Sequence, residues 1–172
     1  AGVDLLMGEG GNDTLIGGAN NDILDGGAGN DIVIGINFGA TPFPAADEVD
    51  TMFGGDGADQ FWLGDGLFVY YDDGNPFSTG TEQQAIIGDF DEAEGDVIQL
   101  HGAAADYILQ VVDGSTQIFR NGTVLELIGT IHQVTGLSLT DSVFQYVDDD
   151  AVTETLELQL LEFQPTEQLA NL

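Results

Sequence analysis

The feature that most constrains this chain is an aspartate that returns every nine residues near its start. In units of nine the sequence reads AGVDLLM, GEGGNDTLI, GGANNDILD and GGAGNDIVI, and after an interruption DEVDTMF and GGDGADQFW. The sixth position of every unit is aspartate, and the eighth is a large apolar residue. A fixed period of this kind predicts a solenoid in which each unit stacks on its neighbours. The aspartates are Asp4, Asp13, Asp22, Asp31, Asp50 and Asp59, and the apolar residues are Leu6, Leu15, Leu24, Val33, Met52 and Phe61.

The other positions of the unit predict how it turns. Glycine at positions one, two and four permits positive φ, so that six residues can turn tightly and aim carbonyl groups inward. Positions seven to nine are expected to form a short strand whose middle side chain points into the core. Two units then make one coil, which predicts one row of Asp13, Asp31 and Asp59 and a second row of Asp4, Asp22 and Asp50. Because an insertion at 37–46 precedes Asp50, the pairing of Asp22 with Asp50 is expected to be the looser one.

Stacked loops of this composition gather carboxylate and carbonyl oxygens, which are the ligands of a hard cation such as Ca²⁺. The chain has 31 acidic residues, one basic residue and a formal net charge of −30. Such a charge excludes nucleic acid as a partner and makes the chain repel itself unless cations neutralise it. A thin roll buries little apolar surface, so cation binding is expected to contribute directly to folding. The absence of cysteine excludes disulfides and cysteine-based zinc sites.

The six units resemble the RTX (repeats in toxin) family, whose consensus is GGxGxDxUx, over roughly the span from Ala1 to Gly66. The resemblance implies an all-β fold, a right-handed parallel β-roll of nonapeptides followed by a β-rich C-terminal cap. It also implies roughly four to six Ca²⁺ ions held between stacked loops. The expected ligands are Asp4, Gly8, Gly10, Asp13, Gly17, Ala19, Asp22, Gly26, Ala28, Asp31, Gly35, Asn37, Asp50, Gly54, Asp56 and Asp59.

The remainder of the chain divides into three further segments by pattern. Residues 67–100 are expected to hold an insertion, with turn residues at 73–76, and a segment that resembles the end of RTX arrays. By that resemblance Asp89 and Asp96 are expected to ligate a terminal Ca²⁺. Residues 101–147 alternate apolar and polar residues around Asp113-Gly114 and Asn121-Gly122, which predicts a β-meander that caps the roll. The tail, 148–172, fits a strand or an amphipathic helix equally, and the resemblance allows it to hold a type I secretion signal.

No catalytic site is expected in this chain. His101 and His132 are the only histidines, and they lack a zinc-protease spacing, so both are interpreted as structural or surface residues. Arg120 is expected to form an ion pair rather than to bind substrate. The aromatic residues Trp62, Phe68, Tyr70 and Tyr71 are expected to pack, although a ligand platform is the alternative. No apolar run is long enough to span a membrane.

The expected function is that of a calcium-binding structural module, the C-terminal part of an exported RTX protein, which folds when it meets Ca²⁺ outside the cell. Its expected location is extracellular or at the cell surface, and its expected partners are Ca²⁺ and the type I secretion machinery. One alternative is the non-catalytic repeat module of a secreted protease, lipase or epimerase, whose catalytic domain would lie upstream. Another is an adhesion module that binds a glycan or surface partner through the insertions.

Overall fold

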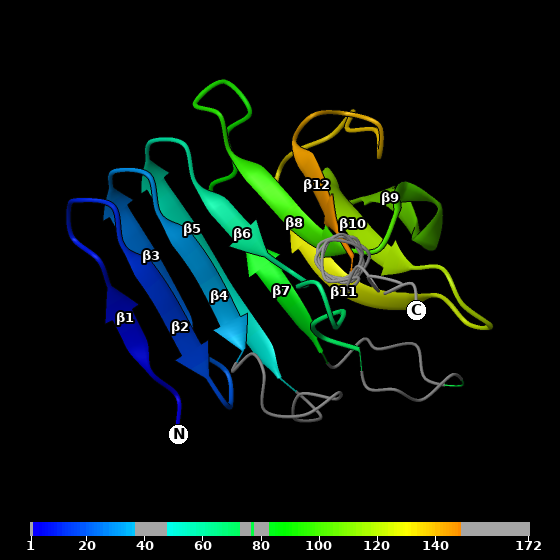
Figure 1. Cartoon of the computed structure of the whole chain (residues 1–172), viewed down its shortest axis with the longest axis horizontal. Helices are drawn as coiled ribbons and strands as arrows, with labels where there is room; N and C mark the ends of the chain where they lie inside the picture. The colour runs from blue at the N-terminus through cyan, green and yellow to red at the C-terminus, as the bar shows by residue number, and fades with distance from the viewer. Residues whose placement is uncertain (1, 37–47, 73–76, 78–82, 149–172) are drawn as a thin grey trace, which may run out of the picture.

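The computed structural model describes residues 2–36, 48–72, 77 and 83–148, and in this part of the chain the fold is built from two facing β-sheets (Figure 1). The insertion at 37–46 with Asn37, the turn at 73–76 and the tail beyond residue 148 lie outside the described residues.

The chain winds between the two sheets, so that successive strands of the repeats belong to alternate sheets. In the seven-stranded sheet the order is β1 (Leu5–Met7), β3 (Ile23–Ala28), β5 (Val49–Asp56), β7 (Gln84–Ile87), β11 (Glu126–Ile131), β10 (Ser115–Arg120) and β9 (Tyr107–Val112). In the five-stranded sheet the order is β12 (Phe144–Val147), β8 (Val97–His101), β6 (Gln60–Trp62), β4 (Ile32–Ile36) and β2 (Thr14–Gly18). A short 3-10 helix, η1 (Ala104–Asp106), precedes β9.

The register of the parallel strands confirms the two-unit coil. Leu6 pairs with Leu24 and Leu24 with Met52 in one sheet, while Leu15 pairs with Val33 and Val33 with Phe61 in the other. These are the eighth positions of the units, and from Leu24 to Phe61 they are fully buried between the sheets. The apolar residue that recurs every nine residues is therefore the core of a parallel β-roll.

The strands of the roll run further than the three positions predicted, because they continue through the glycines that follow. The strand β2 includes Gly17 and Gly18, and β5 extends to Asp56. Positive φ occurs at position two, as in Gly27, and at position four, as in Gly29. Position one does not adopt it, so the prediction of positive φ at all three glycine positions was wrong for the first.

The predicted β-meander is present in the second half of the molecule. The strands β9, β10 and β11 pair antiparallel, and the turn between β9 and β10 places Asp113 and Gly114 at positive φ. The last of these strands, β11, pairs parallel with β7, and β12 pairs parallel with β8. Both sheets therefore continue past the repeats without interruption, and the meander extends one of them.

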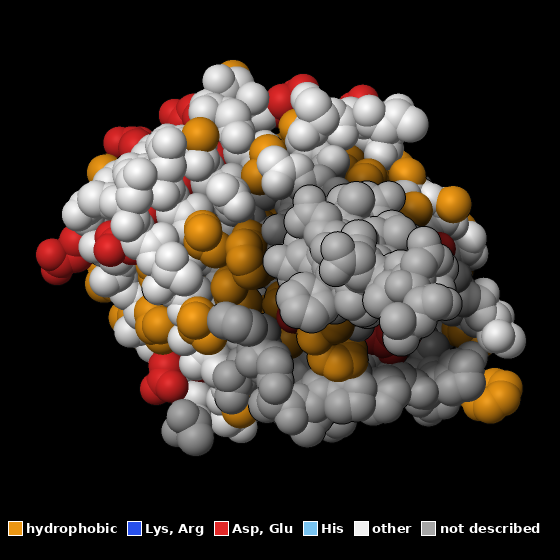
Figure 2. All heavy atoms as spheres, in the orientation of Figure 1, with side chains coloured by type: hydrophobic (Ala, Val, Ile, Leu, Met, Phe, Trp, Pro, Cys, Tyr) orange, Lys and Arg blue, Asp and Glu red, His pale blue; other side chains and the backbone are white. Residues whose placement is uncertain are grey.

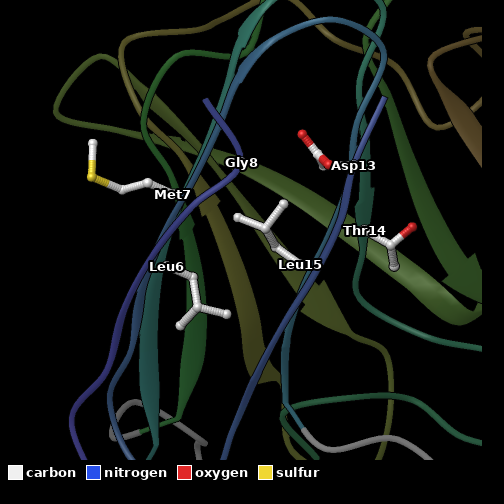
Figure 3. Close-up of a pocket in the computed structure, with 6 residues that line it drawn as sticks. All are labelled: Leu6, Met7, Gly8, Asp13, Thr14 and Leu15. Atoms are coloured by element: carbon white, nitrogen blue, oxygen red, sulfur yellow. The ribbon is translucent and has the colours of Figure 1, made fainter. Parts of the chain in front are cut away.

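At the opposite end, beside β1, the core is uncovered. A hollow of about 410 Å³ is lined by residues of β1, β2 and the loop between them (Figure 3). The alternating residues Leu5 and Met7 are more than half exposed, and Leu6 packs against the core. Among the described residues no helix is long and apolar enough to cross a membrane.

Candidate metal sites

Two rows of aspartates run along the edges of the roll, one residue from each coil. In the first row, the backbone N–H of Asp13 donates to Asp31 Oδ1 and that of Asp31 donates to Asp59 Oδ1, both at 2.8 Å. In the second row, the N–H of Asp4 donates to Asp22 Oδ1 and that of Asp22 to Asp50 Oδ1, both at 2.7 Å. The insertion at 37–46 therefore does not loosen the second row, contrary to expectation.

In four of these aspartates the second carboxylate oxygen has no such partner. The Oδ2 atoms of Asp13, Asp22, Asp31 and Asp59 are buried and make no hydrogen bond in the described structure. A buried anionic oxygen without a donor costs free energy unless a cation or a proton satisfies it. The chain has no lysine and a single arginine, Arg120, so its own side chains cannot neutralise the two rows.

Each unpartnered oxygen faces a glycine at position one of its own loop. A Cβ atom built on Gly17 would lie 2.7 Å from Asp22 Oδ2 and would collide with the carbonyl oxygen of Gly35 in the next coil. The same collision recurs at Gly26, against Asp31 Oδ2 and the carbonyl oxygen of Gly54. Position one is therefore glycine because carboxylate and carbonyl oxygens converge beside it. An oxygen-rich cradle of this kind fits a hard divalent cation.

The predicted carbonyl ligands fall into two groups in the structure. Those at position one lie beside the carboxylates, as just described for Gly17 and Gly26. Those at position three also connect the coils, since the carbonyl oxygens of Ala28 and Asp56 accept from Gly11 N and Gly29 N, both at 2.8 Å. The position-one residues are Gly8, Gly17, Gly26, Gly35 and Gly54, and the position-three residues are Gly10, Ala19, Ala28 and Asp56, whereas Asn37 lies outside the described residues.

The first row ends in the two aspartates expected to close the array. Asp96 stacks on Asp59, whose N–H donates to Asp96 Oδ1 at 2.9 Å, while Asp91 N–H donates to Asp96 Oδ2 at 2.8 Å. Asp89 accepts from the backbone N–H groups of Gly54 and Gly55, both at 2.9 Å. Both carboxylates are thus placed at the array end as expected, and both also satisfy backbone donors of the last loops.

The second row ends differently, in an aromatic hydroxyl. Ala85 occupies the register position opposite Asp50, so no further aspartate stacks there. Instead the buried Tyr71 hydroxyl donates to Asp50 Oδ2 at 2.8 Å. Tyr70 and Tyr71 are each 1% exposed, which confirms that these two aromatic residues pack rather than form a surface platform.

The electrostatics of the rows show how strongly these carboxylates are crowded. Burial, together with the charges of Asp96, Asp31 and Asp89 and against a hydrogen bond from Asp31 N–H, raises the pKa of Asp59 to about 6. Burial likewise raises the pKa of Asp50 to about 6. The ionised form of these carboxylates is therefore disfavoured in the ion-free roll, and a bound cation would stabilise it.

Two features of the loops were missed by sequence reasoning. The first is Glu48, whose buried carboxylate lies with those of Asp22 and Asp50, with ligand oxygens all within 4.8 Å of one another. Burial, followed by the charges of Asp50 and Asp22, raises the pKa of Glu48 to about 8. Its signal was an acidic residue at position four, where complete units carry glycine or asparagine.

The second missed feature is a ladder of asparagines at position five. Asn12 Oδ1 accepts from Asn30 N at 3.0 Å, and Asn30 Oδ1 accepts from Ala58 N at 3.1 Å. On the other edge Asn21 Oδ1 accepts from Val49 N at 3.1 Å. These side chains tie successive loops together beside the aspartate rows. The repetition of asparagine at this position was the available signal.

The residues 1–33 and 47–66 match the family model of the RTX calcium-binding nonapeptide repeat, in four copies. This part of the chain is an RTX repeat array. RTX repeats bind Ca²⁺, so the oxygen cradles belong to a calcium-binding structural module, which is not a catalytic unit. The RTX array accounts for the first half of the described fold, and the meander follows it.

Among solved structures the chain is similar to the AlgE6R3 subunit of the mannuronan C5-epimerase from Azotobacter vinelandii, determined in solution. The two share 21% sequence identity over 99% of this chain and 85% of that chain, with a TM-score of 0.46. No protein among the curated sequences matches the chain.

Proposed function

We propose that this RTX module is a calcium-triggered folding unit, in which Ca²⁺ ions bridge loops of successive coils along both edges. The observation that carries the proposal is the set of buried Oδ2 atoms without hydrogen-bond partners on Asp13, Asp22, Asp31 and Asp59. Each of these oxygens lies beside the glycine cradle of a stacked loop, where a hard cation gains several oxygen ligands at once.

The proposed ligand set is the two aspartate rows with the loop carbonyls. Asp31 and Asp22 lie in the interior of their rows, where each stacks on an aspartate of the coil before and the coil after. Asp4 begins the second row, and Asp89 and Asp96 serve a terminal ion. The number of ions in this proposal is roughly four to six, since each pair of stacked loops forms one site.

The module is further proposed to act during export. Extracellular calcium modules bind at roughly 10⁻⁴–10⁻³ M, well above the free Ca²⁺ of a cytosol. Without ions, the aspartate rows repel one another and the chain stays unfolded, in the state in which it can pass through a secretion channel. Outside, bound Ca²⁺ stabilises the folded state by mass action, by about 2.7 kcal/mol per site at 100 times the Kd.

A calcium titration tests this function. In a chelator the repeats should be unfolded, so that the chain is expanded and loses much of its β signal in circular dichroism; with Ca²⁺ the chain should become compact and β-rich with a steep transition. The ion count follows from equilibrium dialysis at saturation. Mg²⁺ should replace Ca²⁺ poorly, because it demands a small octahedral shell and retains its waters. An unchanged spectrum and radius in chelator would exclude ion-driven folding, and a nanomolar midpoint would exclude the export switch.

A further inference from the structure

One buried carboxylate in the roll departs from the consensus of the repeat. Glu48 is 2% exposed, and neither of its carboxylate oxygens has a hydrogen-bond partner in the described structure. The carboxylates of Asp22 and Asp50, which are 1% and 0% exposed, face it. One oxygen from each of these three residues lies within 4.8 Å of the others. Three buried anionic groups at this separation require a shared cation or protons.

The backbone at Glu48 differs from that of position four in the complete units. There Gly11, Asn20, Gly29 and Gly57 have positive φ, a conformation that glycine and asparagine adopt far more readily than glutamate. Glu48, which follows the insertion, is not among the described non-glycine residues with positive φ. Position four of this loop therefore lacks the left-handed conformation of the complete units, so a glutamate can stand there without backbone strain.

The backbone on both sides of Glu48 is fixed to neighbouring coils. Its carbonyl oxygen accepts from Gln84 N at 3.0 Å, while the next residue, Val49, donates its N–H to Asn21 Oδ1 at 3.1 Å. The Glu48 side chain thus starts from a backbone held between the coil before and the coil after. This placement is a preorganised one, which reduces the cost of ordering a ligand when an ion binds.

The loops of the two edges consequently differ in charge at position four. Between Asp31 and Asp59 the corresponding position four is Gly57, which adds no carboxylate. Between Asp22 and Asp50, Glu48 adds a third. The sole arginine is engaged in an ion pair with Asp72, so it does not neutralise this cluster.

We propose that Glu48 is an additional calcium ligand and that the Asp22–Glu48–Asp50 site binds Ca²⁺ most tightly in the array. This inference rests on the proposed calcium function and adds to it a ligand that the repeat consensus does not contain and an order of filling. Calcium affinity rises with the number of charged ligands and with the rigidity of the site. Tyr71, whose hydroxyl donates to Asp50 Oδ2, is a positioning residue beside the ion.

Glu48→Gln tests the ligand role, because it keeps the size of the side chain and removes its charge. Glu9→Gln is the matched control, since Glu9 is an exposed glutamate in a loop of the other edge. Calorimetric titration of the full chain with Ca²⁺ should show that Glu48→Gln loses the tightest class of site or weakens it by about tenfold, and that Glu9→Gln does not. Equal titrations for the two variants would overturn the proposal.

Terbium luminescence gives a second readout that a merely structural role would not move. Tyr71 lies directly beside the cluster, so Tb³⁺ bound there should show emission sensitised by this tyrosine at the first equivalent added. Tyr71→Phe should reduce that emission per bound ion, and Glu48→Gln should shift it to later equivalents. Emission from the first equivalent that is unaffected by either substitution would place the first ion elsewhere and overturn the order of filling.

The same measurements separate this inference from the proposed function. If the unsubstituted chain neither binds Ca²⁺ nor folds with it, the calcium function itself fails. If it binds and folds while Glu48→Gln behaves like Glu9→Gln, only the role of Glu48 fails. A Glu48→Gln chain that folds at saturating Ca²⁺ with one ion fewer by dialysis supports the proposal directly.

Discussion

The two halves of this molecule share their sheets but differ in what satisfies their buried polar groups. In the repeat half (residues 2–66), the buried side-chain atoms without hydrogen-bond partners all lie between Asp13 and Asp59, whereas the described residues of the cap half (83–148) have none. In the cap half, polar side chains find protein partners, as when Tyr107 Oη donates to the His101 carbonyl at 2.6 Å. A continuous sheet therefore does not imply that its two halves are stabilised by the same interactions.

The change occurs at the point where the aspartate rows end. Opposite Asp50 the next coil carries Ala85, yet β5 and β7 pair as regularly as the repeat strands do. Beyond this coil the meander contributes core residues such as Ile118 and Ile128, both fully buried. The repeat half is thus expected to depend on ions, and the cap half on apolar burial.

Removal of Ca²⁺ should produce the largest difference in stability between the two halves. In excess chelator, backbone amides of the repeat strands, such as those of Leu24 and Val33, should lose nearly all protection from hydrogen exchange. Amides of the meander, such as Ile118 and Ile128, should retain a larger part of theirs, because their core does not depend on carboxylate rows. Exchange followed residue by residue measures both. Uniform loss over the two halves would mean that the cap has no stability of its own.

The next largest effect is expected from Gly26→Ala. Its Cβ would collide with Asp31 Oδ2 and lie 2.6 Å from the Gly54 carbonyl oxygen, so two coils would have to move apart. Overpacking of this kind costs about 1–3 kcal/mol. Gly10→Ala is the control, since its Cβ would meet only the Ala28 carbonyl oxygen at 3.6 Å. Thermal unfolding at saturating Ca²⁺ should separate the two variants; equal midpoints would show that the cradle adapts.

A smaller effect should distinguish the interior of a row from its end. Asp31 stacks between Asp13 and Asp59, whereas Asp4 begins its row and is exposed. Asp31→Ala should raise the Ca²⁺ midpoint by about tenfold and Asp4→Ala by much less, because an interior aspartate serves the loops on both sides. Calcium titrations followed by circular dichroism measure both midpoints. Equal midpoints would contradict the assignment of ions to stacked loop pairs.

Much of the repeat half could be predicted from the sequence because every unit has the same local pattern. The nine-residue spacing of aspartates such as Asp22 and of apolar residues such as Leu24 predicted the two-unit coil, the aspartate rows and the core. The same spacing resumes at Asp50, as the structure confirms. Antiparallel pairing in the cap also followed from local signals, the alternation and the Asp113-Gly114 turn. The nine-residue repeat and the alternation in the meander therefore predict most of the fold.

What the sequence did not predict depends on contacts between distant segments. Glu48 and Tyr71 both meet Asp50, but Glu48 departs from the glycine or asparagine of position four, and Tyr71 lies beyond the repeats. The reason for glycine at position one also required the neighbouring coil, since the obstacle to a Cβ on Gly26 is the carbonyl of Gly54. A single unit contains neither partner, so its pattern could not distinguish a steric requirement from a conformational one.

The smallest effect should come from Arg120, the one basic residue, which links the cap to the segment after the repeats. Its guanidinium pairs with Asp72, as expected, and the side chains are 44% and 8% exposed. Because the arginine is partly solvated, Arg120→Gln should lower the free energy of unfolding by only about 0.5–1 kcal/mol. Arg120→Lys should recover part of this loss, and the difference between the variants should shrink at high salt.

The Ca²⁺ midpoint should stay unchanged, since Asp72 belongs to neither aspartate row. Chemical denaturation at saturating Ca²⁺ measures the stability and the titration measures the midpoint; a midpoint that moves with Arg120→Gln would show that the two halves are energetically coupled through this pair.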